Sequence, residues 1–341
     1  MIDLDQYKRQ AKELLRRARA AQADALARLR QHHPAHESTP APDSMRLADA
    51  QLVIARENGF ATWSGFKEFV LFRDAVGALD SGDLGRLQAL IEERPSLLRY
   101  RCRTGAPYEA GYFAGATLLH HIAGNPDRGP LPSNILDGAR LLIRDGFDPT
   151  AAADTIALLL TSKRAAEAGV ALPLIDLLMK AGALFDLDAP GVLSLPLLNA
   201  APATAEALVR RGAKMDLRHA TALGKMSALA VMLAAAVEPG TLEEALAYAC
   251  ICGQREAASL LAGHGARGDV LVSPGGQTPR TALHEAANRG FLEIAKLLLD
   301  GGADATVVEP HWGGTAADWA DHGGHPEVAT LLRQNVSSAG R

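Results

Sequence analysis

The stretch 278–304, TPRTALHEAANRGFLEIAKLLLDGGAD, decides the fold of this 341-residue chain. Thr281 is a good helix N-cap, because its hydroxyl accepts a hydrogen bond from a free backbone N–H group of the first turn. Gly290 ends this helix and turns the chain, and Gly301-Gly302 ends a second one. Apolar residues recur with helical spacing at Ala282, Leu283, Ala286 and Ala287, then at Phe291, Ile294, Leu297 and Leu298. The stretch therefore predicts two short helices joined by a tight turn.

The ending of this stretch recurs along the chain. A pair of apolar residues is followed, a few residues later, by Gly-Ala or a close variant. The second members of these pairs stand at positions 142, 178, 209, 261, 298 and 332, separated by 36, 31, 52, 37 and 34 residues. The gap of 52 leaves room for two short units, and the segment 229–233 (LAVML) supplies the missing helix. A helix pair cannot bury its apolar faces alone, so this period predicts a stacked repeat array.

The first turn of three of the predicted pairs resembles the ankyrin repeat. Thr281-Ala-Leu-His284 is similar to that family's T-P-L-H phrase, as are Thr117-Leu-Leu-His120 and, with Asp in place of His, Thr315-Ala-Ala-Asp318. The middle units, about 150–240, lack the phrase. The resemblance implies an all-α ankyrin-repeat solenoid of about seven to eight helix-turn-helix units over residues 74–335. It also implies that His120 and His284 are structural and hydrogen-bond backbone between repeats.

Residues 1–73 do not fit the repeat and are expected to form an N-terminal helical cap. We expect a helix over 8–30, a linker at about 32–43, and a second helix over 45–58 capped by Ser44. The phrase Gly59-Phe60-Ala-Thr62-Trp63 resembles the cap of some bacterial ankyrin proteins, and its aromatic residues are expected to pack there. At the other end, residues 336–341 are expected to be a disordered tail.

Composition excludes several classes of protein. Hydrophobic residues make up 48% of the chain, which excludes wholesale disorder. The net charge of −4 and the scattered basic residues argue against nucleic-acid binding. The chain shows neither a signal peptide nor an apolar run long enough for a membrane helix. Its three cysteines are too few and wrongly spaced for a zinc site, so we expect reduced core thiols and a cytoplasmic protein.

Two groups of residues are candidates for a binding site. The first is the loop 102–116, where Tyr108, Glu109 and Tyr112 stand among glycines and a proline. Rigid aromatic side chains beside a carboxylate suit a recognition loop, although a locally packed hairpin fits the same sequence. The second is the position after the T-x-L-H histidine, which carries His121, Tyr248, Glu285 and Trp319. Stacked repeats place this column along one inner face, where we expect an exposed polar and aromatic stripe; packed or solvated variation is the alternative.

The last unit adds Trp312, in the segment HWGG, to these candidates. Tryptophan beside a glycine turn suits stacking on a ligand, and it equally suits capping of the final repeat. His322 and His325 lack a third ligand, so no metal and no cofactor are predicted.

The leading interpretation is a binding module that engages a protein or peptide partner through its concave face and the loop 102–116. The alternative is a small-molecule enzyme, either a lyase, an isomerase or a hydrolase, with a pocket around His121, Glu109 and Tyr112. A small-molecule ligand remains an open possibility under either interpretation.

Overall fold

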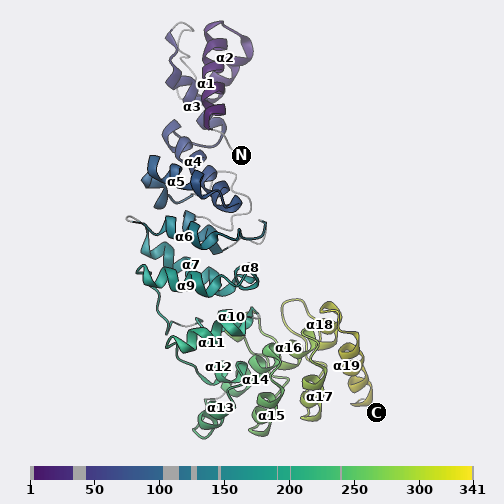
Figure 1. Cartoon of the computed structure of the whole chain (residues 1–341). Helices are drawn as coiled ribbons and strands as arrows, with labels where there is room; N and C mark the ends of the chain where they lie inside the picture. Colours follow the sequence, from purple (N-terminus) through teal and green to yellow (C-terminus); the bar gives the residue numbers. More distant parts are fainter. Residues whose placement is uncertain are drawn as a thin grey trace. The chain divides into compact units, whose positions relative to one another are not determined.

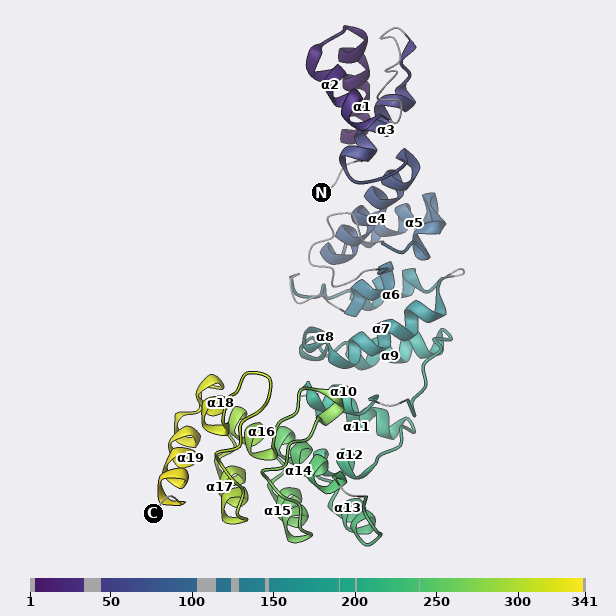
Figure 2. The same ribbon diagram turned by 180° about the vertical axis from the view of Figure 1, so that it is seen from behind.

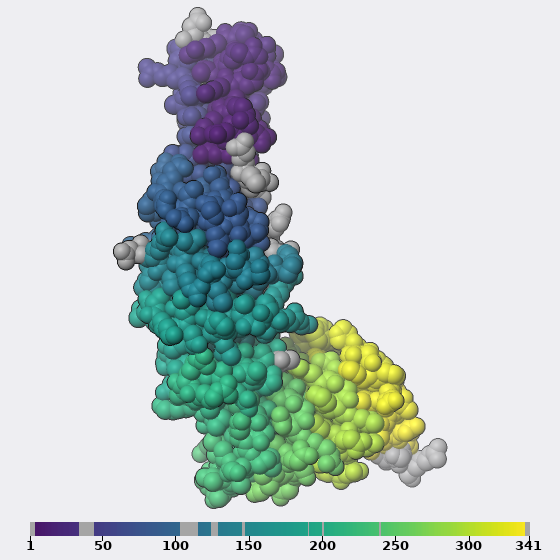
Figure 3. All heavy atoms as spheres, in the orientation of Figure 1, coloured from purple at the N-terminus to yellow at the C-terminus, as the bar shows by residue number. Residues whose placement is uncertain are grey.

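The computed structural model describes residues 4–33, 44–102, 115–123, 129–144, 147–189, 191–199, 201–238 and 240–339. Within these ranges the chain is helical, and its only extended pairings are isolated antiparallel bridges, which confirms the predicted all-α class (Figure 1). The chain divides into two compact units. The N-terminal unit comprises Met1–Leu159 and Glu167–Phe185, and the C-terminal unit comprises Leu160–Ala166 and Asp186–Arg341. Side chains fill the space between the ribbons within each unit (Figure 3).

The N-terminal unit begins with three helices packed on one another. They are α1 (Leu4–Arg19), α2 (Ala23–His32) and α3 (Leu47–Glu57). The expectation of one helix over 8–30 is wrong, because the chain turns at Ala21, whose φ is +54°. A straight helix separates Leu14 from Leu29 by roughly 22 Å. Both leucines are buried, and the turn lets α1 and α2 each pack against α3.

Helix α4 (Trp63–Ser81) connects this three-helix region to the first helix pair. It starts at the N-cap Thr62 and packs against α5 (Leu84–Glu93). The expected aromatic packing is present: Phe66 lies 4.8 Å from Tyr7, 5.4 Å from Phe60 and 5.7 Å from Trp63, measured between ring centroids. Because α4 runs continuously through position 73, the division into a cap and a repeat array at that residue remains a prediction.

The rest of the N-terminal unit consists of shorter elements. They are the 3₁₀ helices η3 (Pro95–Leu98) and η5 (Leu118–Ala123), and α6 (Ile135–Leu142), α7 (Pro149–Thr161) and α9 (Ala171–Lys180). Helix α8 (Lys163–Glu167) lies at the division between the two units. The T-x-L-H phrase at Thr117–His120 thus opens a 3₁₀ segment rather than an α-helix, and this segment packs between α4 and α6.

The C-terminal unit contains the most regular helix pairs. These are α10 (Ser194–Leu198) with α11 (Pro202–Arg210), α12 (Leu217–Ala222) with α13 (Met226–Leu233), α14 (Thr241–Cys252) with α15 (Arg255–Gly263), α16 (Ala282–Asn288) with α17 (Leu292–Asp300), and α18 (Ala316–His322) with α19 (Pro326–Ala339). Helices α12, α14, α16 and α18 follow one another in a row, and α15, α17 and α19 form a second row beside it (Figures 1 and 2). The last helix extends to Ala339, into the segment expected to be a disordered tail.

Small residues let the helices of the first row approach closely. The buried residues of α14 include Ala245, Ala247 and Ala249, and α16 and α18 are similarly rich in alanine. Each turn to the second row uses a glycine with positive φ. At Gly290 (φ +73°) a β-carbon would lie 2.4 Å from Nδ1 of His325 in the next pair. The turn therefore requires glycine for both its backbone conformation and its packing.

Helix α10 departs from this regular stacking. It packs against α14 and against the 3₁₀ helix η6 (Pro274–Gly276), which belongs to the segment before α16. Leu198 lies so close to Gly275 that a β-carbon there would be 2.4 Å from its Cδ1 atom, and the Arg289 guanidinium donates a hydrogen bond to the Leu198 carbonyl (3.3 Å). A segment of the C-terminal unit itself thus covers part of α14.

Candidate functional site

Glu309 holds the turn that presents Trp312. The turn is closed by an antiparallel bridge between Val308 and Thr315. The Glu309 carboxylate accepts hydrogen bonds from the backbone N–H groups of His311 (2.8 Å), Trp312 (2.7 Å) and Gly314 (3.5 Å). Burial opposes ionisation of this carboxylate, but the three N–H donors outweigh burial and lower the pKa of Glu309. The Trp312 backbone is therefore held in place while its side chain, 71% exposed, projects into solvent.

Trp312 stacks on Trp319, with ring centroids 5.4 Å apart and ring planes inclined by 39°. Trp319 lies on α18 and is buried. The guanidinium group of Arg280 lies over the Trp319 ring at 5.1 Å from its centroid, a cation–π arrangement. The exposed Trp312 ring thus stacks on the Trp319 ring, which the Arg280 guanidinium also contacts.

A buried ion pair anchors Arg280. Its Nε atom lies 2.7 Å from Oε1 of Glu285, which is on α16 and only 2% exposed. Burial raises the pKa of Glu285, and the positive charges of Arg280 and Arg289 act against that rise. Removing either partner of such a pair leaves the other charge buried without compensation.

His284 joins this layer to the hairpin of the next repeat. Its Nδ1 atom lies 2.7 Å from the Thr281 hydroxyl, and its Nε2 atom lies 3.1 Å from the Gly314 carbonyl oxygen. The expected structural role between repeats is therefore confirmed for His284. His120 contacts its own Thr117 in the same way, at 3.0 Å, but its Nε2 atom faces the Asp154 carboxylate at 3.7 Å rather than a backbone carbonyl.

The expectation of an exposed stripe in the column after the histidine is wrong. His121, Tyr248, Glu285 and Trp319 are all buried, because neighbouring segments cover the face on which they lie. Trp312 alone, among the proposed site residues that the structure describes, is exposed. His121 belongs to the N-terminal unit and the other four belong to the C-terminal unit.

His121 does not have the environment of a catalytic base that is open to a substrate. Its ring packs edge-on against Phe72, with centroids 5.9 Å apart. Burial, together with the neighbouring His120 and Arg73, lowers the pKa of His121 to about 3. The residues proposed to act with it, Glu109 and Tyr112, lie outside the described residues, as does Tyr108.

Sequence reasoning missed two exposed apolar residues in the segments that precede the inner helices α16 and α18. Leu271 (42% exposed) and Val308 (48% exposed) are separated by 37 residues, as are the repeat-ending glycines Gly265 and Gly302. Each therefore occupies the same position in its repeat, next to or within a bridge that closes the segment before an inner helix. We call Leu271, Val308 and Trp312 the hairpin surface. The equal spacing of Leu271 and Val308 could be seen in the sequence, but the exposure of their side chains could not.

The described ranges lack a metal site and a membrane-spanning helix. They contain no group of three or more His, Cys, Asp or Glu side chains arranged to hold a metal ion. None of the helices described is long and apolar enough to span a membrane. Cys102, Cys250 and Cys252 are free thiols, and burial raises the pKa of Cys252 to about 11, which keeps that thiol protonated and unreactive.

Comparison with known proteins agrees with the histidine geometry and the helix pairs. Residues 164–308 match the family model for ankyrin repeats (3 copies). The chain is also 32% identical over 128 residues to cyclin-dependent kinase 4 inhibitor B of Bos taurus, a match that covers 36% of this chain and 92% of that protein. The chain belongs to the ankyrin-repeat family. Both findings support a protein-interaction module, and the ankyrin match covers most of the region in which the T-x-L-H phrase is missing.

Proposed function

We propose that this ankyrin-repeat protein binds a protein partner through the hairpin surface of its C-terminal unit. The observation that carries the proposal is Trp312, a large aromatic side chain that is 71% exposed while its backbone is held by Glu309 and its ring is backed by Trp319. A pre-ordered aromatic side chain loses little conformational entropy when a partner covers it, and tryptophan is enriched among the residues that dominate binding energy.

The composition of the hairpin surface favours an apolar segment of the partner. Leu271 and Val308 offer aliphatic area at equivalent positions of successive repeats. The nearby charges of Arg280 and Glu285 already compensate each other at 2.7 Å. A partner would therefore gain most by burying apolar side chains against Trp312 and its neighbours. The name of the bovine relative, which describes an inhibitor of a kinase, is a further reason to propose a protein partner.

Two finer expectations belong to the same proposal. One is that the concave face and the loop 102–116, with Tyr108, Glu109 and Tyr112, take part in binding. The other is a cytoplasmic location, which the three free thiols support because disulfides are rare in reducing compartments.

Affinity capture with quantitative mass spectrometry tests the proposal. The bait is the full chain, compared with Trp312→Ala and with Val231→Ala. Val231 is the matched control, since it is 75% exposed but lies on α13, away from the hairpins. We expect a partner that is recovered with the native chain and with Val231→Ala, and whose recovery falls at least about tenfold with Trp312→Ala. Equal recovery with both variants, at unchanged helicity, contradicts the role of the hairpin surface. Tyr112→Ala tests the loop separately.

A further inference from the structure

Positive charge is concentrated in the first two helices of the chain. Residues 4–33 hold eight Lys or Arg side chains and three Asp or Glu, a net charge of +5, whereas the whole chain carries −4, so the rest of it carries −9. Helix α1 alone holds six of these eight cations. Like charges four residues apart on a helix repel each other, so this concentration of charge does not stabilise α1.

Most of the cations of α1 lie on one side of the helix. An α-helix turns by about 100° per residue, and on this basis five of its cations fall within an arc of about 100°. They are Lys8, Arg9, Lys12, Arg16 and Arg19, and we call them the basic stripe. All five residues are exposed. The stripe is about 16 Å long, because each helical residue adds about 1.5 Å.

Other sides of α1 fix the helix in the fold. Its buried side chains are Ala11, Leu14 and Ala18, and it packs against α3. Arg17, which lies outside the stripe, donates a hydrogen bond to the Gln22 side chain (2.6 Å) and pairs with Asp24. Arg19, at the end of the stripe, donates to the carbonyl of Met45 (2.8 Å). The basic stripe is therefore carried by a packed helix, and a partner that binds it does not have to order the backbone.

Carboxylates of α1 itself show what the stripe recognises. Asp5 lies in the same arc, and Lys8 Nζ donates a hydrogen bond to its Oδ1 atom at 2.8 Å. This hydrogen bond is the largest of the effects that lower the pKa of Asp5, and the charge of Lys12 adds to it. Arg16 binds both carboxylate oxygens of Glu13, at 2.8 and 2.5 Å. Both pairs are exposed, so they contribute little to stability and can be exchanged for carboxylates of a partner.

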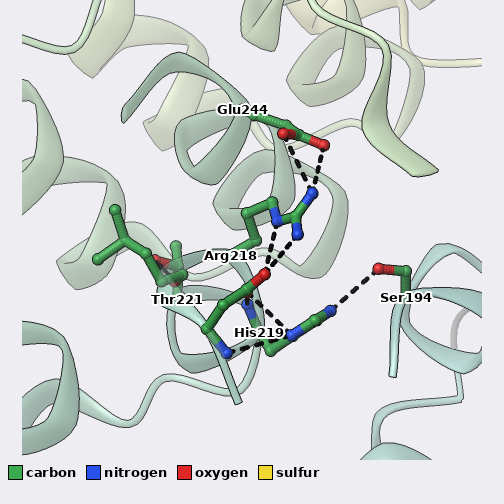
Figure 4. Close-up of polar contacts among 7 residues, drawn as sticks. Ser194, Arg218, His219, Thr221 and Glu244 are labelled. Carbon is green, nitrogen blue, oxygen red and sulfur yellow. Dashed lines mark hydrogen bonds and ion pairs between the residues drawn. The ribbon is translucent and has the colours of Figure 1, made fainter. Parts of the chain in front are cut away.

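A polar cluster in the C-terminal unit differs, because its groups are compensated within the fold. Arg218 lies between two carboxylates: its Nε donates to Asp216 Oδ2 at 2.9 Å and its Nη1 to Glu244 Oε1 at 3.1 Å (Figure 4). His219 accepts a hydrogen bond at Nδ1 from the backbone N–H of Asp216 (3.3 Å), and its Nε2 lies 3.0 Å from Ser194 Oγ. The basic stripe, by contrast, has five cations and a single carboxylate in its arc.

We propose that the basic stripe of α1 binds an acidic segment, rich in Asp and Glu, of a partner protein. Its five cations and Asp5 together carry +4. An extended peptide advances by about 3.3 Å per residue, so about five residues span the stripe. A run of four or five successive carboxylates therefore matches the stripe in both charge and length.

The charge of the rest of the chain favours a short acidic segment over a long polyanion. A nucleic acid or a membrane surface extends beyond the stripe and meets a chain that is negative elsewhere. A short segment interacts mainly with the stripe, because salt screens charges more than about 8 Å away. Tyr7, the aromatic residue of α1, packs edge-on against Phe66 at 4.8 Å and does not stand free to stack on a base. The stripe is independent of the hairpin surface, since no residue is shared between the two.

Fluorescence anisotropy of a labelled peptide of about ten glutamates, titrated with the full chain, tests the proposal. We expect binding at low salt that weakens as salt is added. Lys12→Glu is expected to raise the Kd at least about tenfold, because it places a negative charge in the middle of the stripe. Lys296→Glu is the matched control: this exposed lysine of α17 undergoes the same change of charge, and its Kd is expected to stay within about twofold of the native value.

The stability of the variant separates binding from folding. Lys12 is four residues after Lys8 and four before Arg16, so a glutamate in its place forms attractive pairs in both directions. The urea midpoint of Lys12→Glu, followed by circular dichroism, is therefore expected to be unchanged or higher while peptide binding falls.

Three outcomes overturn the proposal. One is that the native chain does not bind the glutamate peptide at low salt. Another is an equal loss of affinity in Lys12→Glu and Lys296→Glu, which would mean that only the net charge matters. The third is tighter binding of a single-stranded oligonucleotide or of anionic lipid vesicles than of the peptide, which would assign the stripe to another class of partner.

Discussion

The burial of His121 makes a quantitative prediction about pH. With a folded-state pKa of about 3 against an ordinary value of 6.5, the native N-terminal unit stays unprotonated at this residue while the unfolded chain takes up a proton. The unfolded state then binds more protons, so stability is fully present above pH 6.5 and is lost as the pH falls towards 3. The loss attributable to His121 is about 2 kcal/mol at pH 5 and about 3.3 kcal/mol at pH 4.

Urea unfolding of His121→Gln beside the native chain isolates this contribution. Glutamine has a similar volume and no titration in this range, so the other titrating groups affect both proteins alike. Replacing Trp312 and Trp319 by phenylalanine leaves Trp63 as the remaining tryptophan. It lies on α4, the helix that carries Phe72, the ring against which His121 packs. The difference in unfolding free energy between the two proteins is expected to shrink by about 1.3 kcal/mol per pH unit as the pH falls from 6 to 4. Parallel pH profiles would refute the argument that His121 is buried and neutral.

Two further predictions concern the C-terminal unit. Gly290→Ala is expected to lower the unfolding free energy by at least about 1 kcal/mol more than Gly302→Ala. Both glycines have positive φ, but only at Gly290 does a β-carbon meet the His325 ring. Urea unfolding followed by circular dichroism measures both losses, and equal losses would contradict the packing argument. Glu309→Ala removes the acceptor for three backbone N–H groups and is expected to speed hydrogen exchange at the amides of His311 and Trp312. Unchanged exchange would mean that the turn keeps its conformation without Glu309.

The repeating helix pairs could be predicted from the sequence, because the signals for them are local. Thr281 starts α16 as its N-cap, and the glycine at 290 ends the turn at a positive φ that glycine tolerates best. The period of the apolar pairs likewise predicted the missing helix at 229–233, which is α13. The turn at Ala21 was not predictable in this way, since alanine favours a helix and gives no local signal of positive φ.

Only the tertiary structure shows which side chains are buried and which residues far apart in sequence contact one another. The column of His121, Tyr248, Glu285 and Trp319 is buried because other parts of the fold lie over it. The segments that cover Tyr248 include α10 and η6. The position of these covering segments depends on packing between parts of the chain that are far apart in sequence. For the same reason no spacing rule brings Ser194 to His219, which follows it by 25 residues. Local patterns fix helices, whereas exposure and the pairing of distant side chains depend on how those helices stack.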